Sequence, residues 1–113
     1  MITAKQAFKK SKIGYDNYLN RVKKIVKDEL ENDIAEKIET AMGVGHFFIF
    51  YWRDFTWFAQ QTIAPEDYIL ILKEKLQSLG YKVITIDGNT DIKIEIYWDQ
   101  EEEEEEEEEE DNG

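Results

Sequence analysis

The sequence contains no cysteine, and it has a single histidine and a single proline among its 113 residues. Without cysteine the chain forms no disulfide and has no thiolate nucleophile, which fits a reducing compartment. One histidine, His46, cannot by itself supply the nitrogen and sulfur ligands of an ordinary zinc site. We therefore expect neither a metal centre nor a cofactor.

Long apolar runs are also absent. No stretch approaches the roughly 18 uninterrupted apolar residues that a membrane-spanning helix needs. The first residues lack the apolar run and the small-residue cleavage site of a signal peptide. We expect a cytoplasmic protein with no membrane partner, whose size leaves room for one domain over residues 1–98.

The familiar catalytic motifs are missing as well. There is no nucleophile elbow and no phosphate-binding glycine loop. Residues 43–45, Gly-Val-Gly, are expected to follow a helix rather than a strand, so we interpret them as a helix stop and not as part of a dinucleotide fingerprint. Residues 87–91 match the first three ligand positions of a calcium loop, but Ile92 and Trp98 stand where glycine and glutamate are required. The sequence favours a protein that is not an enzyme.

What the chain does have is a concentrated negative charge. Residues 99–111 carry twelve acidic side chains, which equals the whole net charge of -12, because residues 1–98 hold 14 acids and 14 bases. A run of glutamates buries no apolar surface and repels itself. We expect residues 99–113 to form a disordered acidic tail that follows the folded domain.

Charge also varies along residues 1–98. Residues 1–27 carry eight bases and one acid, whereas residues 28–98 carry six bases and thirteen acids. The sign changes between Lys27 and Asp28, inside a predicted helix. The acids that follow oppose the dipole of that helix, which suggests that helix stability did not select them.

Local signals predict two helices in the first part of the chain. Thr3 and Gln6 have the spacing of a capping box, which indicates a short helix over residues 4–10 that ends near Gly14. Asp16 is a candidate cap for a second, longer helix that runs to Met42. Its apolar stripe, with members three or four apart, is Tyr15, Leu19, Val22, Val26, Leu30, Ile34, Ile38 and Ala41.

The remainder of the domain predicts a sheet and one further helix. Aromatic residues 47–52 indicate a strand, and residues 54–62 are either a second strand or an irregular loop. Pro65 begins a helix whose predicted apolar face is Ile69, Leu72, Leu76 and Leu79. Strands over residues 81–87 and 91–98 are joined by a hairpin turn at Gly88-Asn89. The pattern predicts an α+β fold in which a small antiparallel or mixed sheet of about three strands packs against two or three helices.

The aromatic segment has two interpretations. Strand alternation sends Phe48, Phe50 and Trp52 to one face of the sheet and their neighbours to the other. If the first face is open, it marks a partner or homodimer surface. Alternatively, residues 54–62 fold back and cover it. The candidate aromatic contacts are Phe48, Phe50, Trp52 and Trp57.

The acidic residues predict a basic partner. Extended poly-glutamate presents one charge per about 3.3 Å, close to the spacing of about 3.4 Å between phosphates along one DNA strand. A groove that neutralises phosphates is therefore a suitable receptor, although a tail that only aids solubility is an alternative. The candidate partner-binding residues are Asp28, Glu29, Glu31, Asp33, Glu36, Glu39, Asp99, Glu101, Glu102, Glu103, Glu104, Glu105, Glu106, Glu107, Glu108, Glu109, Glu110 and Asp111.

Three segments of the chain resemble small acidic proteins encoded by tailed bacteriophages. They are residues 1–7 (MITAKQA), residues 72–83 (LKEKLQSLGYKV) and residues 94–98 (IEIYW). The resemblance implies a host-takeover protein that occludes the DNA-binding surface of a basic nucleoid protein, such as the histone-like HU dimer. It also implies that the protein acts in the bacterial host cell without catalytic residues and mimics DNA rather than binding it.

Three alternatives stay open at this stage. The chain is also compatible with a phage virion or assembly protein that packs through its aromatic sheet, with a solubilising tail. A second alternative is an inhibitor of RNA polymerase. The third is a direct nucleic-acid binder that uses the basic residues 1–27, although the acidic tail argues against the basic groove that base stacking requires.

Overall fold

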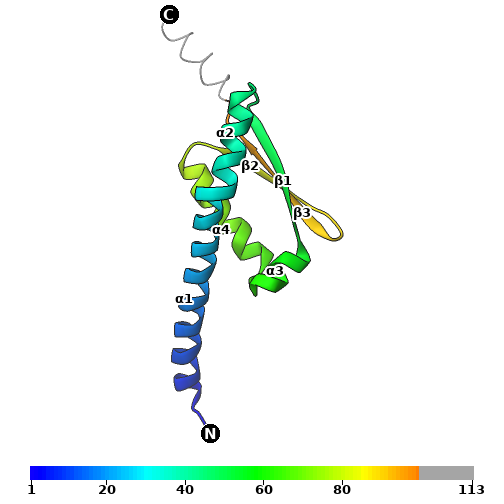
Figure 1. The fold of residues 1–113 in the computed structure, drawn as a ribbon. Coiled ribbons are helices and arrows are strands. Elements are labelled where there is room, and N and C mark those ends of the chain that lie inside the picture. The colour runs from blue at the N-terminus through cyan, green and yellow to red at the C-terminus, as the bar shows by residue number, and fades with distance from the viewer. Residues whose placement is uncertain (100–113) are drawn as a thin grey trace, which may run out of the picture.

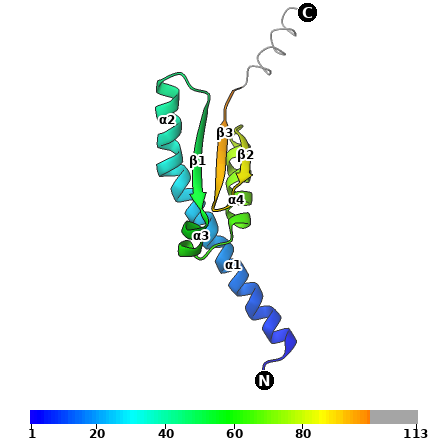
Figure 2. The same ribbon diagram turned by 90° about the vertical axis from the view of Figure 1, so that its right-hand side faces the viewer.

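A three-stranded antiparallel sheet and a layer of helices make up residues 1–99, which are the residues described in the computed structural model (Figure 1). Strand β3 (Asp91–Tyr97) lies between β1 (Phe48–Asp54) and β2 (Lys82–Asp87). The helices lie on one side of this sheet (Figure 2). The predicted α+β fold with about three strands and two or three helices is confirmed. The predicted disorder of the tail falls on residues 100–113, outside the described residues.

One long helix runs through the first 43 residues. It comprises α1 (Ala4–Glu29), a π-helical turn η1 (Leu30–Ile34) and α2 (Ala35–Gly43). The predicted capping box is confirmed, since Thr3 and Gln6 exchange hydrogen bonds. The predicted break near Gly14 is wrong. The helix continues through Gly14 and Asp16, because a glycine inside a helix costs only about 1 kcal/mol.

The π turn keeps one apolar stripe facing the core. Val22, Val26, Ile34 and Ile38 are buried, and the steps between them are multiples of four residues. Because an α-helix has 3.6 residues per turn, each step of four drifts around the helix by about 40°. The wider π turn absorbs one extra residue, so the stripe before it and the stripe after it both face the core.

Residues 54–62 form neither a strand nor an irregular loop, and that prediction is wrong. They form helix α3 (Phe55–Gln61), which begins where the Asp54 carboxylate accepts a hydrogen bond from the Trp57 N–H at 2.7 Å. Such a cap satisfies a backbone donor at the start of a helix. Thr62 ends the helix with a φ of 56°.

Helix α4 (Pro65–Ser78) begins with proline, as predicted, and packs on the sheet. Its buried face differs from the prediction at both ends, and Ile69 at the first end is only partly buried. Leu79 lies beyond the last helical residue and is exposed, because the chain turns away at Gly80, whose φ is 92°. The side chains of α4 that are buried are Tyr68, Ile71, Leu72 and Leu76.

The predicted hairpin between β2 and β3 is confirmed. The Gly88 N–H donates to the Asp91 carbonyl at 2.8 Å, and a Cβ at Gly88 would lie 2.8 Å from the Asp91 carboxylate. A side chain at this position would crowd Asp91, so the turn favours glycine. The inward side chains of β3, Ile92, Ile94 and Ile96, form the floor of the core. Among residues 1–99, no helix has both the length and the apolar character needed to cross a membrane.

Two isoleucines in the paired strands test which face of the sheet is covered. Ile94 is 0% exposed against the helices, whereas Ile86 is 50% exposed on the opposite face. We expect Ile94→Ala to lower the free energy of unfolding by about 2–5 kcal/mol and Ile86→Ala by less than about 1 kcal/mol. Urea denaturation measures both. Equal losses would contradict a sheet with one open face.

Candidate functional site

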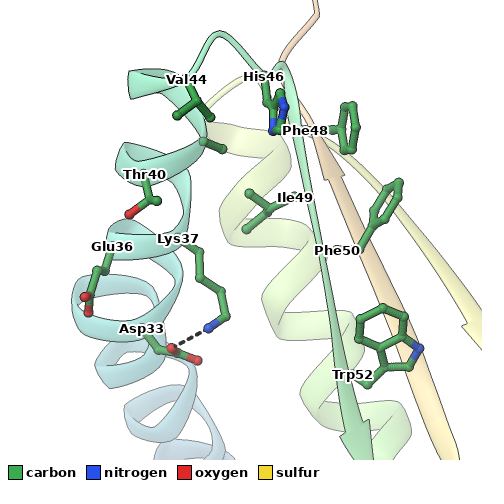
Figure 3. Close-up of a pocket in the computed structure, with 11 residues that line it drawn as sticks. Asp33, Glu36, Lys37, Thr40, Val44, His46, Phe48, Ile49, Phe50 and Trp52 are labelled. Atoms are coloured by element: carbon green, nitrogen blue, oxygen red, sulfur yellow. Dashed lines mark hydrogen bonds and ion pairs between the residues drawn. The ribbon is translucent and has the colours of Figure 1, made fainter.

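The outward face of β1 is the most distinctive surface of the protein. Alternation along the strand buries Ile49 and Tyr51 and leaves Phe48, Phe50 and Trp52 between 37% and 54% exposed. In Figure 3, Ile49 points toward α2, while these three aromatic side chains point to the other side of β1. Their rings form a row, with the centres of Phe48 and Phe50 4.9 Å apart.

The other two strands extend this surface. Phe50 lies opposite Glu95 of β3, which lies opposite Ile84 of β2, and Trp52, Lys93 and Ile86 form the next row. We call this surface the open face, and its members are Phe48, Phe50, Trp52, Lys82, Ile84, Ile86, Lys93, Glu95 and Tyr97. It is an apolar surface of the kind found at protein–protein contacts.

An ion pair between Lys93 and Glu95 lies at the centre of the open face. Lys93 Nζ is 3.1 Å from Glu95, and the Tyr97 hydroxyl donates to Glu95 at 2.8 Å. The Tyr97 and Lys93 hydrogen bonds hold the pKa of Glu95 below its ordinary value. Lys93 Nζ also lies 4.3 Å from the ring centre of Phe50, at cation–π distance. Since these two charges already satisfy each other, a partner can cover the centre of the face without burying a lone charge, and Lys82 of β2 lies at its edge, opposite Tyr97.

The alternative in which residues 54–62 cover this face is wrong. Helix α3 returns to the helical layer, where Phe58 is buried with its ring centre 5.3 Å from that of Tyr68. The preceding residue, Trp57, also packs edge-on against Tyr68, with the ring centres 5.4 Å apart. The structure therefore brings together the predicted contacts Phe48, Phe50 and Trp52, but places Trp57 apart from them.

A groove runs between α2 and β1 beside the open face. It has a volume of about 700 Å³. One wall is helical and includes Asp33, Glu36 and Thr40, and Val44 and His46 lie at one end (Figure 3). The other wall is β1 with its aromatic residues. We call this feature the α2–β1 groove.

Two of the predicted helix acids contact Arg53. Arg53 of β1 reaches the helix and contacts Glu29 at 3.0 Å and Asp33 at 3.2 Å. The Tyr68 hydroxyl of α4 donates to the other oxygen of Glu29. The side chains of Glu29 and Arg53 are 12% and 21% exposed. Glu29 is therefore part of the interior, whereas Asp33, whose side chain is 41% exposed, lies at the surface and is shared between Arg53 and Lys37.

Burial changes the pKa values of the groups in this cluster. It raises the pKa of Glu29 above the ordinary glutamate value of 4.5, although the hydrogen bond from Tyr68 and the charge of Arg53 oppose the change. Burial likewise raises the pKa of Tyr51 and Tyr68, so both phenols stay neutral hydrogen-bonding groups. The hydrogen bond from Lys37 lowers the pKa of Asp33. Arg53 thus contacts two carboxyl groups of different acidity, a weaker acid at Glu29 and a stronger acid at Asp33.

The remaining predicted acids fall into three sets. Asp28, Glu31, Glu36 and Glu39 are exposed on the long helix, with Glu31 3.9 Å from Lys27. Asp99 follows the end of β3 and is exposed. The acids from Glu101 to Asp111 fall outside the described residues. The structure therefore supports four exposed helix acids as a candidate anionic surface.

Sequence reasoning missed the contributions of β2 and β3 to the open face. The alternation around the Gly88-Asn89 turn contained the signal, because the hairpin register places Ile84 beside Glu95 and Ile86 beside Lys93. The register of β1 against β3 then places Phe50 beside Glu95 and Trp52 beside Lys93, in the same rows. That pairing joins segments about 45 residues apart and cannot be inferred from local spacing.

Comparisons with known proteins identify no relative. No protein-family model matches the chain, and neither a curated protein nor a solved structure matches it.

The buried ion pair leads to a stability prediction. Arg53→Met leaves Glu29 buried without its cation, so we expect the free energy of unfolding to fall by about 3 kcal/mol. Lys37→Met is the matched control, because the Lys37–Asp33 pair is 3.0 Å long but exposed, and its loss should cost less than about 1 kcal/mol. Urea denaturation compares the two, and similar losses would contradict the structural role of Arg53.

The raised pKa of Glu29 leads to a pH prediction. A carboxyl whose pKa is higher in the folded than in the unfolded state makes the folded state bind more protons. Its contribution to stability is therefore lost as the pH rises from about 4.5 through the raised pKa. Glu29→Gln should remove this part of the pH dependence. Urea denaturation at a series of pH values measures it, and an unchanged pH dependence would contradict the assignment.

Proposed function

We propose that this protein is a non-enzymatic inhibitor that binds a basic DNA-binding protein and blocks its access to DNA by presenting negative charge. The partner class we propose is the bacterial nucleoid protein of the histone-like HU kind. In this proposal the open face supplies the shape-specific contacts and the acidic run supplies the attraction.

One observation carries the proposal: the acidic run begins at the edge of the open face. Tyr97 belongs to that face, and the next residue, Trp98, donates its N–H to the Phe47 carbonyl at 3.0 Å. Asp99, the first acid of the run, follows immediately. Twelve negative charges are thus attached beside an apolar surface. A basic protein with an apolar patch near its DNA-binding groove would match both features.

The two features have different tasks. A uniform polyanion attracts any basic surface and raises association rates, but it does not discriminate among basic proteins. Aromatic side chains such as Phe50 and Trp52 make contacts that depend on the shape of the partner. Of the helix acids, Asp28, Glu31, Glu36 and Glu39 remain available for the partner, because Glu29 and Asp33 contact Arg53.

A second candidate is a phage assembly protein. The exposed aromatics of the open face favour it, because a sheet with one uncovered apolar face can pack against further subunits. The acidic run would then keep the subunits soluble. Assemblies that survive high salt would favour this function, since contacts between apolar faces are screened far less than contacts between charges.

Competition with DNA tests the leading proposal. At low salt we expect the full chain to displace duplex DNA from a purified HU-like dimer, with an apparent affinity that falls steeply as salt rises. Phe50→Ser/Trp52→Ser should weaken binding more than about tenfold. Leu70→Ser, an exposed apolar residue of α4 outside the open face, should leave binding unchanged.

Replacing Glu101 to Glu110 with glutamine tests the role of charge. We expect slower association and a smaller salt dependence. Absence of binding at low salt, or binding indifferent to both sets of substitutions, would refute the proposal. If the full chain captured RNA polymerase and not the nucleoid protein, the function would instead be inhibition of RNA polymerase.

A further inference from the structure

The first four turns of α1 project beyond the rest of the fold. Residues 1–17 are all exposed, and the first tie to the body is Tyr18, which donates to Asp67 and accepts from the Ala64 N–H. Figures 1 and 2 both show this end of α1 extending away from the sheet and from α4. We call residues 4–17 the arm.

The arm carries an apolar stripe that has no partner within residues 1–99 apart from a ring contact between Tyr15 and Tyr18. Ala4, Phe8, Ser11 and Tyr15 recur at intervals of three and four, which places them on one side of the helix. The same intervals lead on to Leu19, Val22 and Val26, which pack into the core. Phe8 is nevertheless 70% exposed and Tyr15 57% exposed. The stripe therefore continues the core-facing side of α1 into solvent.

The same arm is basic. It contains Lys5, Lys9, Lys10 and Lys12 against one acid, Asp16. The helical wall of the α2–β1 groove carries two acids, Asp33 and Glu36, and one base, Lys37, which pairs with Asp33 at 3.0 Å. Glu36 on that wall has no ion-pair partner among residues 1–99. His46 lies at one end of the groove, next to Phe47 in the chain. The Phe47 carbonyl accepts a hydrogen bond from the N–H of Trp98, the residue before the acidic run.

The arm and the groove also agree in size. Phe8 and Tyr15 are about 10 Å apart along the helix axis at 1.5 Å per residue, whereas the helical wall from Asp33 to Val44 is about 16 Å long. Both side chains can therefore enter the groove together. An amphipathic helix that lays such anchors into an apolar groove is a recurrent recognition mode.

The arm cannot occupy the groove of its own molecule. The arm and α2 are the two ends of one uninterrupted helix, so Phe8 and Thr40 are separated by about 48 Å of helix. No loop between them allows the arm to fold back. Any arm in the groove must belong to a second molecule.

We propose that the arm of one molecule docks into the α2–β1 groove of a second copy, with Phe8 and Tyr15 as its anchors. An antiparallel arrangement brings the amino-terminal end of the arm, with Lys5, to the groove end where the partner's acidic run begins. The positive end of the helix dipole adds to that attraction. Because each molecule has both an arm and a groove, reciprocal docking closes a two-fold dimer. This inference does not rest on the proposed function.

The mass of the purified full chain in solution tests the proposal. Sedimentation equilibrium should show a concentration-dependent dimer that weakens as salt rises. Phe8→Asp/Tyr15→Asp should raise the dissociation constant by more than about tenfold. Both residues are exposed on the arm, so the fold should stay intact by circular dichroism. Ile13→Asp is the matched control, because Ile13 is 63% exposed on the other side of the same helix and should leave the dimer unchanged.

Engineered disulfides test the geometry. The natural chain has no cysteine, so Ser11→Cys/Thr40→Cys places one thiol on the arm stripe and one in the groove. These positions lie about 44 Å apart in one molecule, far beyond the Cα separation of up to about 7 Å that a disulfide spans. Oxidation should therefore produce covalent dimers. Ile13→Cys/Thr40→Cys should produce far fewer.

Three results would overturn the proposal. A chain that stays monomeric at every concentration and salt would leave no second copy to dock. Dimers that persist unchanged in Phe8→Asp/Tyr15→Asp would place the contact elsewhere, such as on the open face. A monomer whose arm instead binds anionic lipid vesicles or DNA, with loss of binding in Phe8→Asp/Tyr15→Asp, would assign the arm to a different occupant.

Discussion

The ion pair between Arg53 and Glu29 joins the three parts of the structure on which everything else depends. Arg53 comes from the end of β1, Glu29 from the last turn of α1, and Tyr68 of α4 donates to the same carboxylate. Two charges held this far from water are stable only together, because a lone buried charge costs several kcal/mol. The pair therefore holds β1 against the long helix at the π turn, and this contact sets which side of β1 faces solvent.

That orientation determines the surfaces available for function. Three strands present two faces, and the helices cover one of them (Figure 2). The aromatics of β1 consequently emerge on the uncovered side, where the Lys93–Glu95 pair neutralises the centre. The same contact leaves the α2–β1 groove beside the strand. The partner-binding proposal uses the open face and the dimer proposal uses the groove, and the aromatic residues of β1 border both.

The sequence predicted the features that depend on neighbours in the chain. The Thr3 capping box, the start of α4 at Pro65 and the Gly88 turn are each set by a few adjacent residues. Errors arose where one local signal was given too much weight or where a contact between distant segments decided the structure. Gly14 was expected to end a helix that in fact continues, although residues 1–17 are all exposed, because a single glycine costs a helix only about 1 kcal/mol. Residues 54–62 became a helix because Asp54 caps it and Phe58 packs against Tyr68. The candidate aromatic Trp57 was placed apart for the same reason.

The sequence by itself determined the charges and their order along the chain: a basic first quarter, an acidic second half of the long helix, and the twelve acids of residues 99–111. These are covalent properties that folding does not alter. Only the tertiary structure decided which charges and aromatic rings are available. Glu29 and Asp33 contact Arg53, whereas Glu36 faces the groove, and Phe50 is exposed while Ile49 is buried. Availability depends on what packs against a side chain, and those contacts come from segments that lie far apart in the sequence.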